Sequence, residues 1–316
     1  MDLGSVISKR IAFVFPGQGS QYVGMGKGIY DVSAAARRVF HQADEILGFS
    51  LSSLCFDGPA DLLGDTLNAQ PAIFTVSMAY LEALRERWHQ LGENVAPAFV
   101  AGHSLGEFSA LVAAGVLEFG DALQIVRERA RLMKECGDRR PGGMAAVVGL
   151  EREVLEEVCA TAGDVGTVVL ANDNCPGQSV ISGEVVALER AMGLARERGA
   201  RRVVRLDISI ASHSPLMERV GQQLGEFLNH VPLRDPQVPV VANITGRIMT
   251  TVDDVRKEIA SHTVRPVLWT NSVREMVNEG AGTFLEIGPG QVLGGLIRRI
   301  RNDVEIISAK DFGIAG

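Results

Sequence analysis

A serine flanked by glycines at the end of an apolar run is the feature that most restricts the fold of this chain. The apolar run 98–101 leads into Gly102-His103-Ser104-Leu105-Gly106, and a helical pattern covers 107–114. This spacing fits G-x-S-x-G, in which glycines on both sides let the backbone turn sharply from a strand into a helix. Such a turn pushes the serine hydroxyl outward and aims the N-terminus of the next helix at it. The segment therefore predicts a buried strand, a tight turn and a helix, with Ser104 as a candidate nucleophile.

Strands and helices alternate along most of the chain. The apolar run 11–15 predicts a buried strand that ends in a glycine-rich turn at 16–20. Further predicted elements are helices at 32–47 and 67–91, a helix from 215 to about 229, a strand at 238–242, a helix at 272–279 and a strand at 283–287. This alternation is typical of an α/β protein with a parallel sheet.

The order of elements changes in the middle of the chain. The patterns predict a strand at 144–150, a helix at 151–162, strands at 168–171 and 178–182, a helix at 185–199 and a strand at 202–208. The resulting βαββαβ order matches a split ferredoxin-like unit, which can close a small core of its own. We therefore expect a discontinuous α/β catalytic domain of residues 1–140 and 211–316, with residues 141–210 inserted as a ferredoxin-like subdomain.

Composition excludes some classes of function. The formal net charge of −7 over 316 residues argues against general binding to nucleic acid or to a membrane, because both are polyanions. Four cysteines without a C-x-x-C pair predict neither a metal site nor a disulfide scaffold. The N-terminus lacks a basic stretch followed by an apolar one. We expect a cytoplasmic protein, and a monomer is the default expectation.

A serine hydroxyl needs an adjacent base, normally histidine. Among six histidines, His213 is favoured because it lies in a turn where the small subdomain returns to the large one, a natural place for a cleft. His103 adjoins the serine along a strand and points to the opposite face, so we expect it to pack or to form a hydrogen bond. His262 lies in a polar stretch without a motif, and the other three lie in solvated helical patterns.

Six short motifs occur in a fixed order along nearly the whole chain. They are FPGQGSQ at 15–21, GHSLGE at 102–107, Arg129 in an R-x-x-x-M setting, NDNCPGQ at 172–178, SHSPLM at 212–217 and EIGPG at 286–290. In this order they resemble the malonyl-CoA:acyl carrier protein transacylases and the related acyltransferase domains of polyketide synthases. That resemblance implies an α/β-hydrolase-like large domain with a ferredoxin-like insertion, in agreement with the element patterns.

The resemblance also implies an activity. It implies transfer of a malonyl group from malonyl-CoA to the phosphopantetheine thiol of an acyl carrier protein, by a ping-pong mechanism through acylated Ser104. His213 would be the base, oriented by a backbone carbonyl near Leu268 rather than by an acid. The amides of Leu105 and Gln18 would form the oxyanion hole. Coenzyme A enters only as part of the substrate, without a further cofactor. The remaining residues implied to bind substrate are Asn172, Asn174 and Ser212.

Arg129 is the candidate for substrate selection. It lies in the charged helical segment 124–134 beside Arg127 and Arg131, where a solvated surface residue is the simpler interpretation. The resemblance assigns it to the substrate carboxylate instead. A guanidinium presents a planar fork that binds a carboxylate through two parallel hydrogen bonds. Malonyl and methylmalonyl groups carry that carboxylate, whereas acetyl does not.

Three alternatives remain open. Ser212 stands before His213, where many malonyl-selective polyketide enzymes have phenylalanine, so a methylmalonyl substrate is one alternative; Leu105 favours malonyl. A hydrolase of carrier-bound acyl groups would share the same serine and histidine, although it would have no use for Arg129. A non-enzymatic scaffold is disfavoured because Ser104, His213, Gln18 and Arg129 are all present.

Two arginine clusters in this otherwise acidic chain are candidates for docking an acidic carrier protein. They are Arg201-Arg202-Arg205 and Arg298-Arg299-Arg301. Solvated ends of helices and strands explain each cluster equally well.

Overall fold

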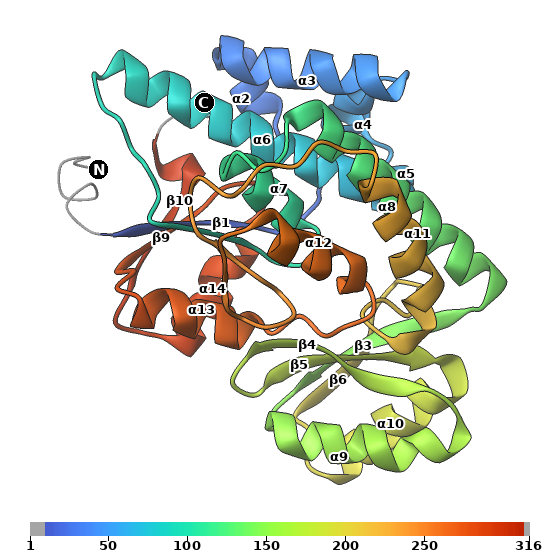
Figure 1. The fold of residues 1–316 in the computed structure, drawn as a ribbon. Helices are drawn as coiled ribbons and strands as arrows, with labels where there is room; N and C mark the ends of the chain where they lie inside the picture. The colour runs from blue at the N-terminus through green and yellow to red at the C-terminus, as the bar shows by residue number, and fades with distance from the viewer. Residues whose placement is uncertain (1–9, 313–316) are drawn as a thin grey trace.

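The computed structural model describes residues 10–312, which form a mixed α/β fold with two separate sheets (Figure 1). The larger sheet has six strands in the order β10-β9-β1-β2-β7-β8. Neighbouring strands run parallel, except that β8 is antiparallel to β7. The strands are β1 (Ile11–Phe15), β2 (Phe99–Gly102), β7 (Val240–Val241), β8 (Ile248–Met249), β9 (Thr283–Glu286) and β10 (Glu305–Ser308). The predicted parallel sheet is confirmed.

Both faces of this sheet are buried, which explains why its strands read as continuous apolar runs. Along β1, Phe13 and Phe15 belong to the core on one face, and Ala12 and Val14 to the core on the other. In Figure 1, α6 and α7 lie on one side of the sheet and α13 and α14 on the other. The helices of this part are α2 (Lys27–Val32), α3 (Ala34–Leu47), α4 (Leu51–Asp57), α5 (Ala60–Gly64), α6 (Thr66–Gln90), α7 (Gly106–Ala113), α8 (Phe119–Arg139), α11 (Glu218–Leu228), α12 (Val252–Ser261), α13 (Trp269–Asn278) and α14 (Val292–Ile300).

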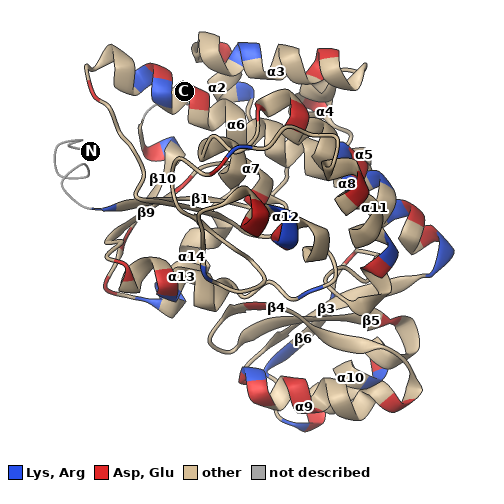
Figure 2. Cartoon of the chain, in the orientation of Figure 1, with Lys and Arg blue, Asp and Glu red and all other residues tan. Residues whose placement is uncertain are grey.

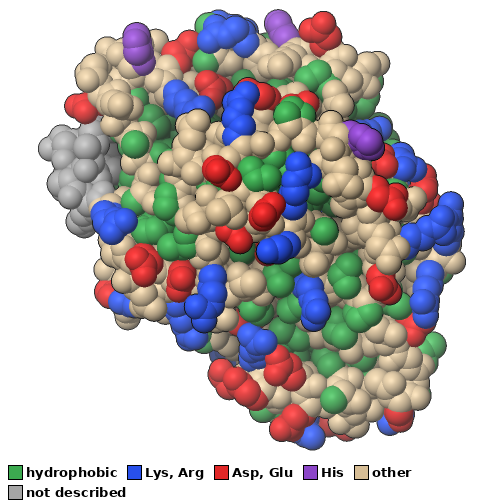
Figure 3. Space-filling view, in the orientation of Figure 1, with side chains coloured by type: hydrophobic (Ala, Val, Ile, Leu, Met, Phe, Trp, Pro, Cys, Tyr) green, Lys and Arg blue, Asp and Glu red, His purple; other side chains and the backbone are tan. Residues whose placement is uncertain are grey.

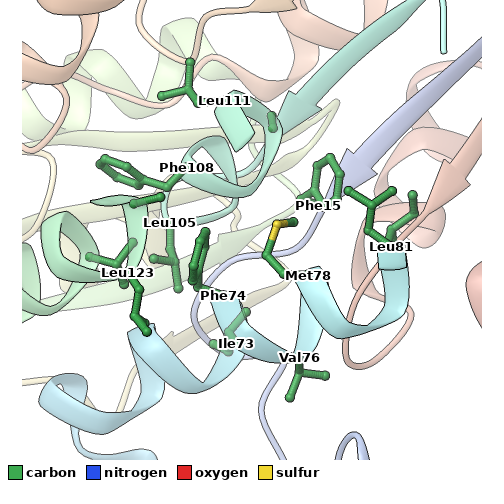
Figure 4. Close-up of a cluster of buried hydrophobic side chains, with 14 of the residues drawn as sticks. Phe15, Ile73, Phe74, Val76, Met78, Leu81, Leu105, Phe108, Leu111 and Leu123 are labelled. Carbon is green, nitrogen blue, oxygen red and sulfur yellow. The ribbon is translucent and has the colours of Figure 1, made fainter. Parts of the chain in front are cut away.

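The larger core lies between α6, α7 and the sheet. Figure 4 shows Phe74 of α6 close to Leu105 at the start of α7, with Phe15 of β1 and Phe108 in the same group. All four side chains are almost completely buried. The turn that carries Ser104 is therefore anchored by the core beneath it.

The smaller sheet is antiparallel and has the order β4-β5-β3-β6. Its elements are β3 (Gly142–Val148), α9 (Arg152–Ala162), β4 (Val168–Cys175), β5 (Gln178–Glu184), α10 (Val185–Glu197) and β6 (Arg202–Arg205). The predicted βαββαβ order is confirmed. Both helices cover one face of the sheet, away from the large part (Figure 1). Met144, Ala171 and Val180 form a small apolar cluster on the other face.

One segment joins the two sheets. Asn172 of β4 forms an isolated parallel bridge to Val267 of the large part. The amide of Asp173 donates to the carbonyl of Val267 at 2.9 Å, and the amide of Val267 donates to the carbonyl of Ala171 at 2.9 Å. The edge strand β4 is therefore tied to the segment that precedes α13.

Charged side chains lie mainly on the outer helices, such as α8, α9 and α10, while β1 carries none (Figure 2). On the face drawn in Figure 3, basic and acidic side chains are interspersed. Across residues 10–312, no helix combines the length and the apolarity needed to cross a membrane.

Most predicted elements are confirmed, and two omissions matter for the site. The predicted strand at 11–15 coincides with β1, and the predicted helix at 67–91 is α6 shifted by one residue. Helices α12 and α14 were not predicted. A signal for α12 is present in the sequence, because Thr251 and Asp254 form a capping box at its start.

Candidate active site

Ser104 stands at the tight turn between β2 and α7, as predicted. Its φ is 48°, in the left-handed region that side chains other than glycine rarely adopt. A Cβ on Gly102 would lie 1.9 Å from the carbonyl carbon of Gly106, and a Cβ on Gly106 would lie 2.1 Å from the carbonyl oxygen of Phe15. Both positions therefore require glycine because backbone atoms occupy the space.

His213 is placed as a base for this serine. Its Nε2 lies 2.8 Å from the Ser104 Oγ. Its Nδ1 lies 2.9 Å from the carbonyl oxygen of His262 and 3.1 Å from that of Arg265. Because carbonyls only accept hydrogen bonds, Nδ1 carries the proton, and Nε2 is left to accept the proton of the serine.

Leu268 does not orient this histidine, so that prediction is wrong. The Leu268 carbonyl accepts hydrogen bonds from the amide and the hydroxyl of Ser272, at 3.0 and 3.2 Å, where α13 begins. The carbonyls that meet His213 follow the end of α12, of which His262 is the C-cap. Carbonyls at the end of a helix have no partner inside it and are free to accept from elsewhere.

Arg129 is buried and contacts the serine, so the simpler interpretation as a solvated surface residue is wrong. Its side chain is 2% exposed. Nη2 donates to the Ser104 Oγ at 3.1 Å and Nη1 to the Gln70 Oε1 at 2.5 Å. Arg131, on the outer face of the same helix, instead pairs with Glu128.

Burial sets the charges around the serine. It lowers the pKa of Arg129 to about 10, and the nearby Glu107 opposes that shift, so the guanidinium stays charged at neutral pH. Burial also moves the pKa of His213 well below its usual value, and the neighbouring His262 and Arg129 lower it further. The histidine is therefore neutral at neutral pH, as a general base must be.

These groups line a cavity of about 440 Å³ between the two sheets. Ser104, His213 and Arg129 contribute from the large part. The apolar residues on its wall are Leu105, Met133, Met144, Ala146, Val180, Leu206, Ile208, Val292, Leu293 and Leu296. Several of these belong to β3 and β5, so the uncovered face of the small sheet closes the site.

The proposed oxyanion donors lie on this cavity. Within residues 10–312, neither the Leu105 amide nor the Gln18 amide donates a hydrogen bond to another group, and both residues line the cavity. A Cβ on Gly17 would lie 2.4 Å from the carbonyl oxygen of His103, so the loop that carries Gln18 packs directly on the serine turn. The Gln18 side chain donates to the Thr66 hydroxyl at 3.0 Å.

The other predicted substrate residues also reach the cavity, which Asn172, Asn174 and Ser212 all line. The Oδ1 of Asn174 lies 2.8 Å from the Nε2 of His103, which confirms the prediction that His103 forms a hydrogen bond. Asn174 therefore has a partner on the turn that carries the serine.

The family model described as acyl transferase domain matches residues 12–310. This chain belongs to the acyl transferase family. A malonyl CoA-acyl carrier protein transacylase of Bacillus subtilis is 44% identical over 303 residues, which cover 96% of this chain and 94% of the relative. One from Escherichia coli is 40% identical over 294 residues, which cover 92% of this chain and 93% of the relative.

Solved structures of acyl transferases have the same fold. An acyl carrier protein S-malonyltransferase from Vibrio cholerae is similar with a TM-score of 0.89 and 39% identity, covering 95% of this chain and 96% of that one. A malonyl-transacylase in complex with a type II PKS acyl-carrier protein has a TM-score of 0.89 and 37% identity, covering 95% of both chains.

Three residues near the site of this acyl transferase were given no role from the sequence, although Glu107 lies in the motif at 102–107. His262, set aside for want of a motif, lies with its ring 5.7 Å from that of His213 and is 1% exposed. Glu107 Oε2 lies 3.5 Å from His262 Nε2, and burial raises the pKa of Glu107 to about 8. Asn243 contacts the serine turn from behind. The one available signal was Glu107, a carboxyl side chain that directly follows the glycine-flanked turn 102–106.

Among residues 10–312, no group of three His, Cys, Asp or Glu side chains is arranged to hold a metal ion.

Proposed function

We propose that this protein transfers a malonyl group from malonyl-CoA to the phosphopantetheine thiol of an acyl carrier protein, through an acyl-serine intermediate on Ser104. The observation that carries the proposal is the convergence on one oxygen: His213 Nε2 at 2.8 Å and Arg129 Nη2 at 3.1 Å both contact the Ser104 Oγ. A base activates a hydroxyl for attack on the thioester. A buried cation beside it suits an acyl group that ends in a carboxylate.

In the first half-reaction, His213 Nε2 takes the proton of Ser104 as the Oγ attacks the thioester carbonyl. The carbonyl oxygen becomes an oxyanion, which the amides of Gln18 and Leu105 stabilise by donating hydrogen bonds. When the intermediate collapses, the carbon–sulfur bond breaks and the imidazolium returns its proton to the coenzyme A sulfur. The products are malonyl-Ser104 and free coenzyme A.

In the second half-reaction, the phosphopantetheine thiol gives its proton to His213 and attacks the serine ester. Collapse breaks the bond to the Ser104 Oγ, which recovers the proton from the imidazolium. Arg129 would hold the malonyl carboxylate in both steps, with Asn172, Asn174 and Ser212 on the cavity wall. All four of these residues line the cavity of about 440 Å³ that also contains Ser104 and His213.

The architecture that we propose has an α/β-hydrolase-like domain of residues 1–140 and 211–316, of which 1–9 and 313–316 lie outside the described residues, and a ferredoxin-like subdomain of residues 141–210. The strand order β4-β5-β3-β6, with α9 and α10 on one face, supports the second assignment. We also propose that the protein acts as a cytoplasmic monomer. Its four free cysteines and a coenzyme A thioester substrate support a reducing compartment.

Intact-mass analysis tests the proposal. Incubation with malonyl-CoA should add one malonyl group to the wild type and none to Ser104→Ala, and holo carrier protein should remove the adduct with matching gain of malonyl on the carrier. Release of free malonate in place of carrier loading would identify a hydrolase. Preferential labelling by methylmalonyl-CoA would instead favour the branched substrate, and no adduct with any acyl-CoA would reject catalysis on Ser104.

A further inference from the structure

Asn243 bonds at two points to the turn that carries Ser104, at Gly102 and at Ser104 itself. It lies two residues beyond β7, and its side chain is buried, with 1% exposed. The Oδ1 accepts from the amide of Ser104 at 2.7 Å, and the Nδ2 donates to the carbonyl of Gly102 at 2.7 Å. We propose that Asn243 is a positioning residue that sets the reactivity of Ser104, an inference that rests on the proposed role of Ser104 as nucleophile.

The position of Asn243 in the sheet explains why the turn needs it. Strands β2 and β7 pair at Val100 with Val240 and at Ala101 with Val241, and this pairing stops as β2 ends. Beyond that point the backbone turns into the left-handed region at Ser104 and can no longer bond to the next strand. The carboxamide of Asn243 supplies the donor and the acceptor that the strand no longer provides.

A carboxamide makes both contacts with one planar group at any pH, because it carries a donor and an acceptor side by side. A hydroxyl is shorter, and a carboxylate has no donor for the Gly102 carbonyl. Without the side chain, the partly buried amide of Ser104 would lose its partner. An amide without a partner is unfavourable where water has little access, so the turn would relax to find one.

Asn243 is itself fixed by its neighbours. Its amide donates to the Glu107 Oε2 at 3.2 Å, and its carbonyl accepts from the amide of Leu268 at 2.8 Å. The same Glu107 oxygen lies 3.5 Å from the Nε2 of His262, whose carbonyl holds His213. Hydrogen bonds therefore connect Ser104 to Asn243 and Asn243 to Glu107, and Glu107 lies beside His262, whose carbonyl holds His213.

These contacts fix the position of the Ser104 Oγ relative to the His213 Nε2, although the Asn243 side chain bonds only to the backbone of the serine turn. Its loss should shift the Ser104 Oγ relative to His213 Nε2 and to the Leu105 amide. Substrate affinity should change little, because Arg129 is held separately by Gln70. The expected signature is a fall in kcat without a matching rise in KM.

The test compares Asn243→Ala, Asn243→Asp and a control, Asn229→Ala, whose asparagine is exposed at the end of α11. Displacing the nucleophile should lower kcat of malonyl transfer by about 10²-fold in Asn243→Ala, with the KM for malonyl-CoA within about twofold. Labelling of Ser104 by a fluorophosphonate, which carries no coenzyme A or carboxylate, should slow in parallel. Asn243→Asp should recover part of the rate, since its carboxyl keeps the acceptor for the Ser104 amide but loses the Nδ2 donor to the Gly102 carbonyl. The control should match the wild type.

Circular dichroism and thermal melting monitor the folding of each variant. If Asn243→Ala does not fold, the comparison rests on Asn243→Asp. Wild-type kcat and labelling rates in either folded variant would overturn the proposal, even with a lowered melting temperature. A rise in the KM for malonyl-CoA with an unchanged kcat would also overturn the proposal. Ser104→Ala distinguishes failure of the proposed function from failure of this inference. Transfer or fluorophosphonate labelling retained in Ser104→Ala would refute the assignment of Ser104 as the nucleophile, whatever the Asn243 variants show.

Discussion

Arg129 Nη2 lies 3.1 Å from the Oγ of Ser104, so the charged group proposed to select the substrate touches the proposed nucleophile. Its other terminal nitrogen is held by Gln70. The group proposed to attack the thioester and the group proposed to select the acyl chain are therefore in direct contact. Substitutions of each residue should separate acyl transfer from substrate selection.

Ser104→Ala should abolish formation of the malonyl adduct because the attacking oxygen is removed. The backbone turn is defined by Gly102, Gly106 and Asn243 rather than by the hydroxyl, so the circular dichroism spectrum should not change. Intact mass after incubation with malonyl-CoA measures the adduct. Near-wild-type transfer by a folded variant would refute the nucleophile assignment.

His213→Ala should slow acylation by about 10² to 10⁴-fold, the usual contribution of a general base. The wild-type pH profile provides an independent check. Burial holds the pKa of His213 well below its usual value, so the neutral, proton-accepting form persists as the pH falls through 6.5. The kcat/KM for acylation should stay flat there and decline only at lower pH. A decline centred at or above pH 6.5 would contradict the assignment.

Arg129→Ala should nearly eliminate malonyl transfer. Stranding the malonyl carboxylate in a buried site costs on the order of 3 to 5 kcal/mol. Acetyl-CoA brings no carboxylate, so acetyl transfer should be unchanged or improved. Arg129→Lys should restore malonyl transfer only in part, since it returns the charge without the planar fork. The measurement is kcat/KM for both acyl-CoAs, with melting temperature as the control.

A parallel loss of malonyl and acetyl transfer would mean that Arg129 supports the structure instead. That outcome would follow if Gln70 needed the guanidinium to keep its place on α6. Gln70→Ala offers a matched comparison, because it removes the neutral partner and leaves the charge.

Arg298→Glu should weaken use of the carrier protein selectively. Arg298 is exposed on α14, the helix whose Leu293 and Leu296 line the cavity, and it has no ion pair within residues 10–312. Exposed ion pairs contribute modestly, so the KM for the carrier should rise by about two- to fivefold. The salt dependence of transfer should weaken, and acylation by malonyl-CoA should not change.

Arg299→Glu serves as the contrast. Arg299 donates to the Gln178 Oε1 at 2.5 Å and to the Pro176 carbonyl at 2.9 Å, so it links α14 to the small sheet. Its reversal should affect both half-reactions, since it disturbs the cavity wall. Equal effects of Arg298→Glu on both half-reactions would reject carrier docking at that residue.

Local sequence patterns predicted most of the elements and the two side chains proposed to react, Ser104 and His213. The continuous apolar run 11–15, followed by a glycine-rich turn, predicts a buried strand, and the glycines at 102 and 106 predict a tight turn because no side chain fits there. The position of His213 in a turn between sheets was also readable, since a change from βαββαβ to alternating elements marks the boundary. These features depend on neighbours in the chain.

Tertiary structure alone decided which groups support those side chains. The acceptors for His213 are the backbone carbonyls of His262 and Arg265. Because every residue has a carbonyl, the residue type does not predict this role. The burial of Arg129 depended on which face of α8 meets Gln70, 59 residues earlier in the chain. Asn243 reaches Ser104 across 139 residues because β7 happens to end beside β2. Such contacts arise from the packing of whole elements, and the local pattern of residues carries no record of them.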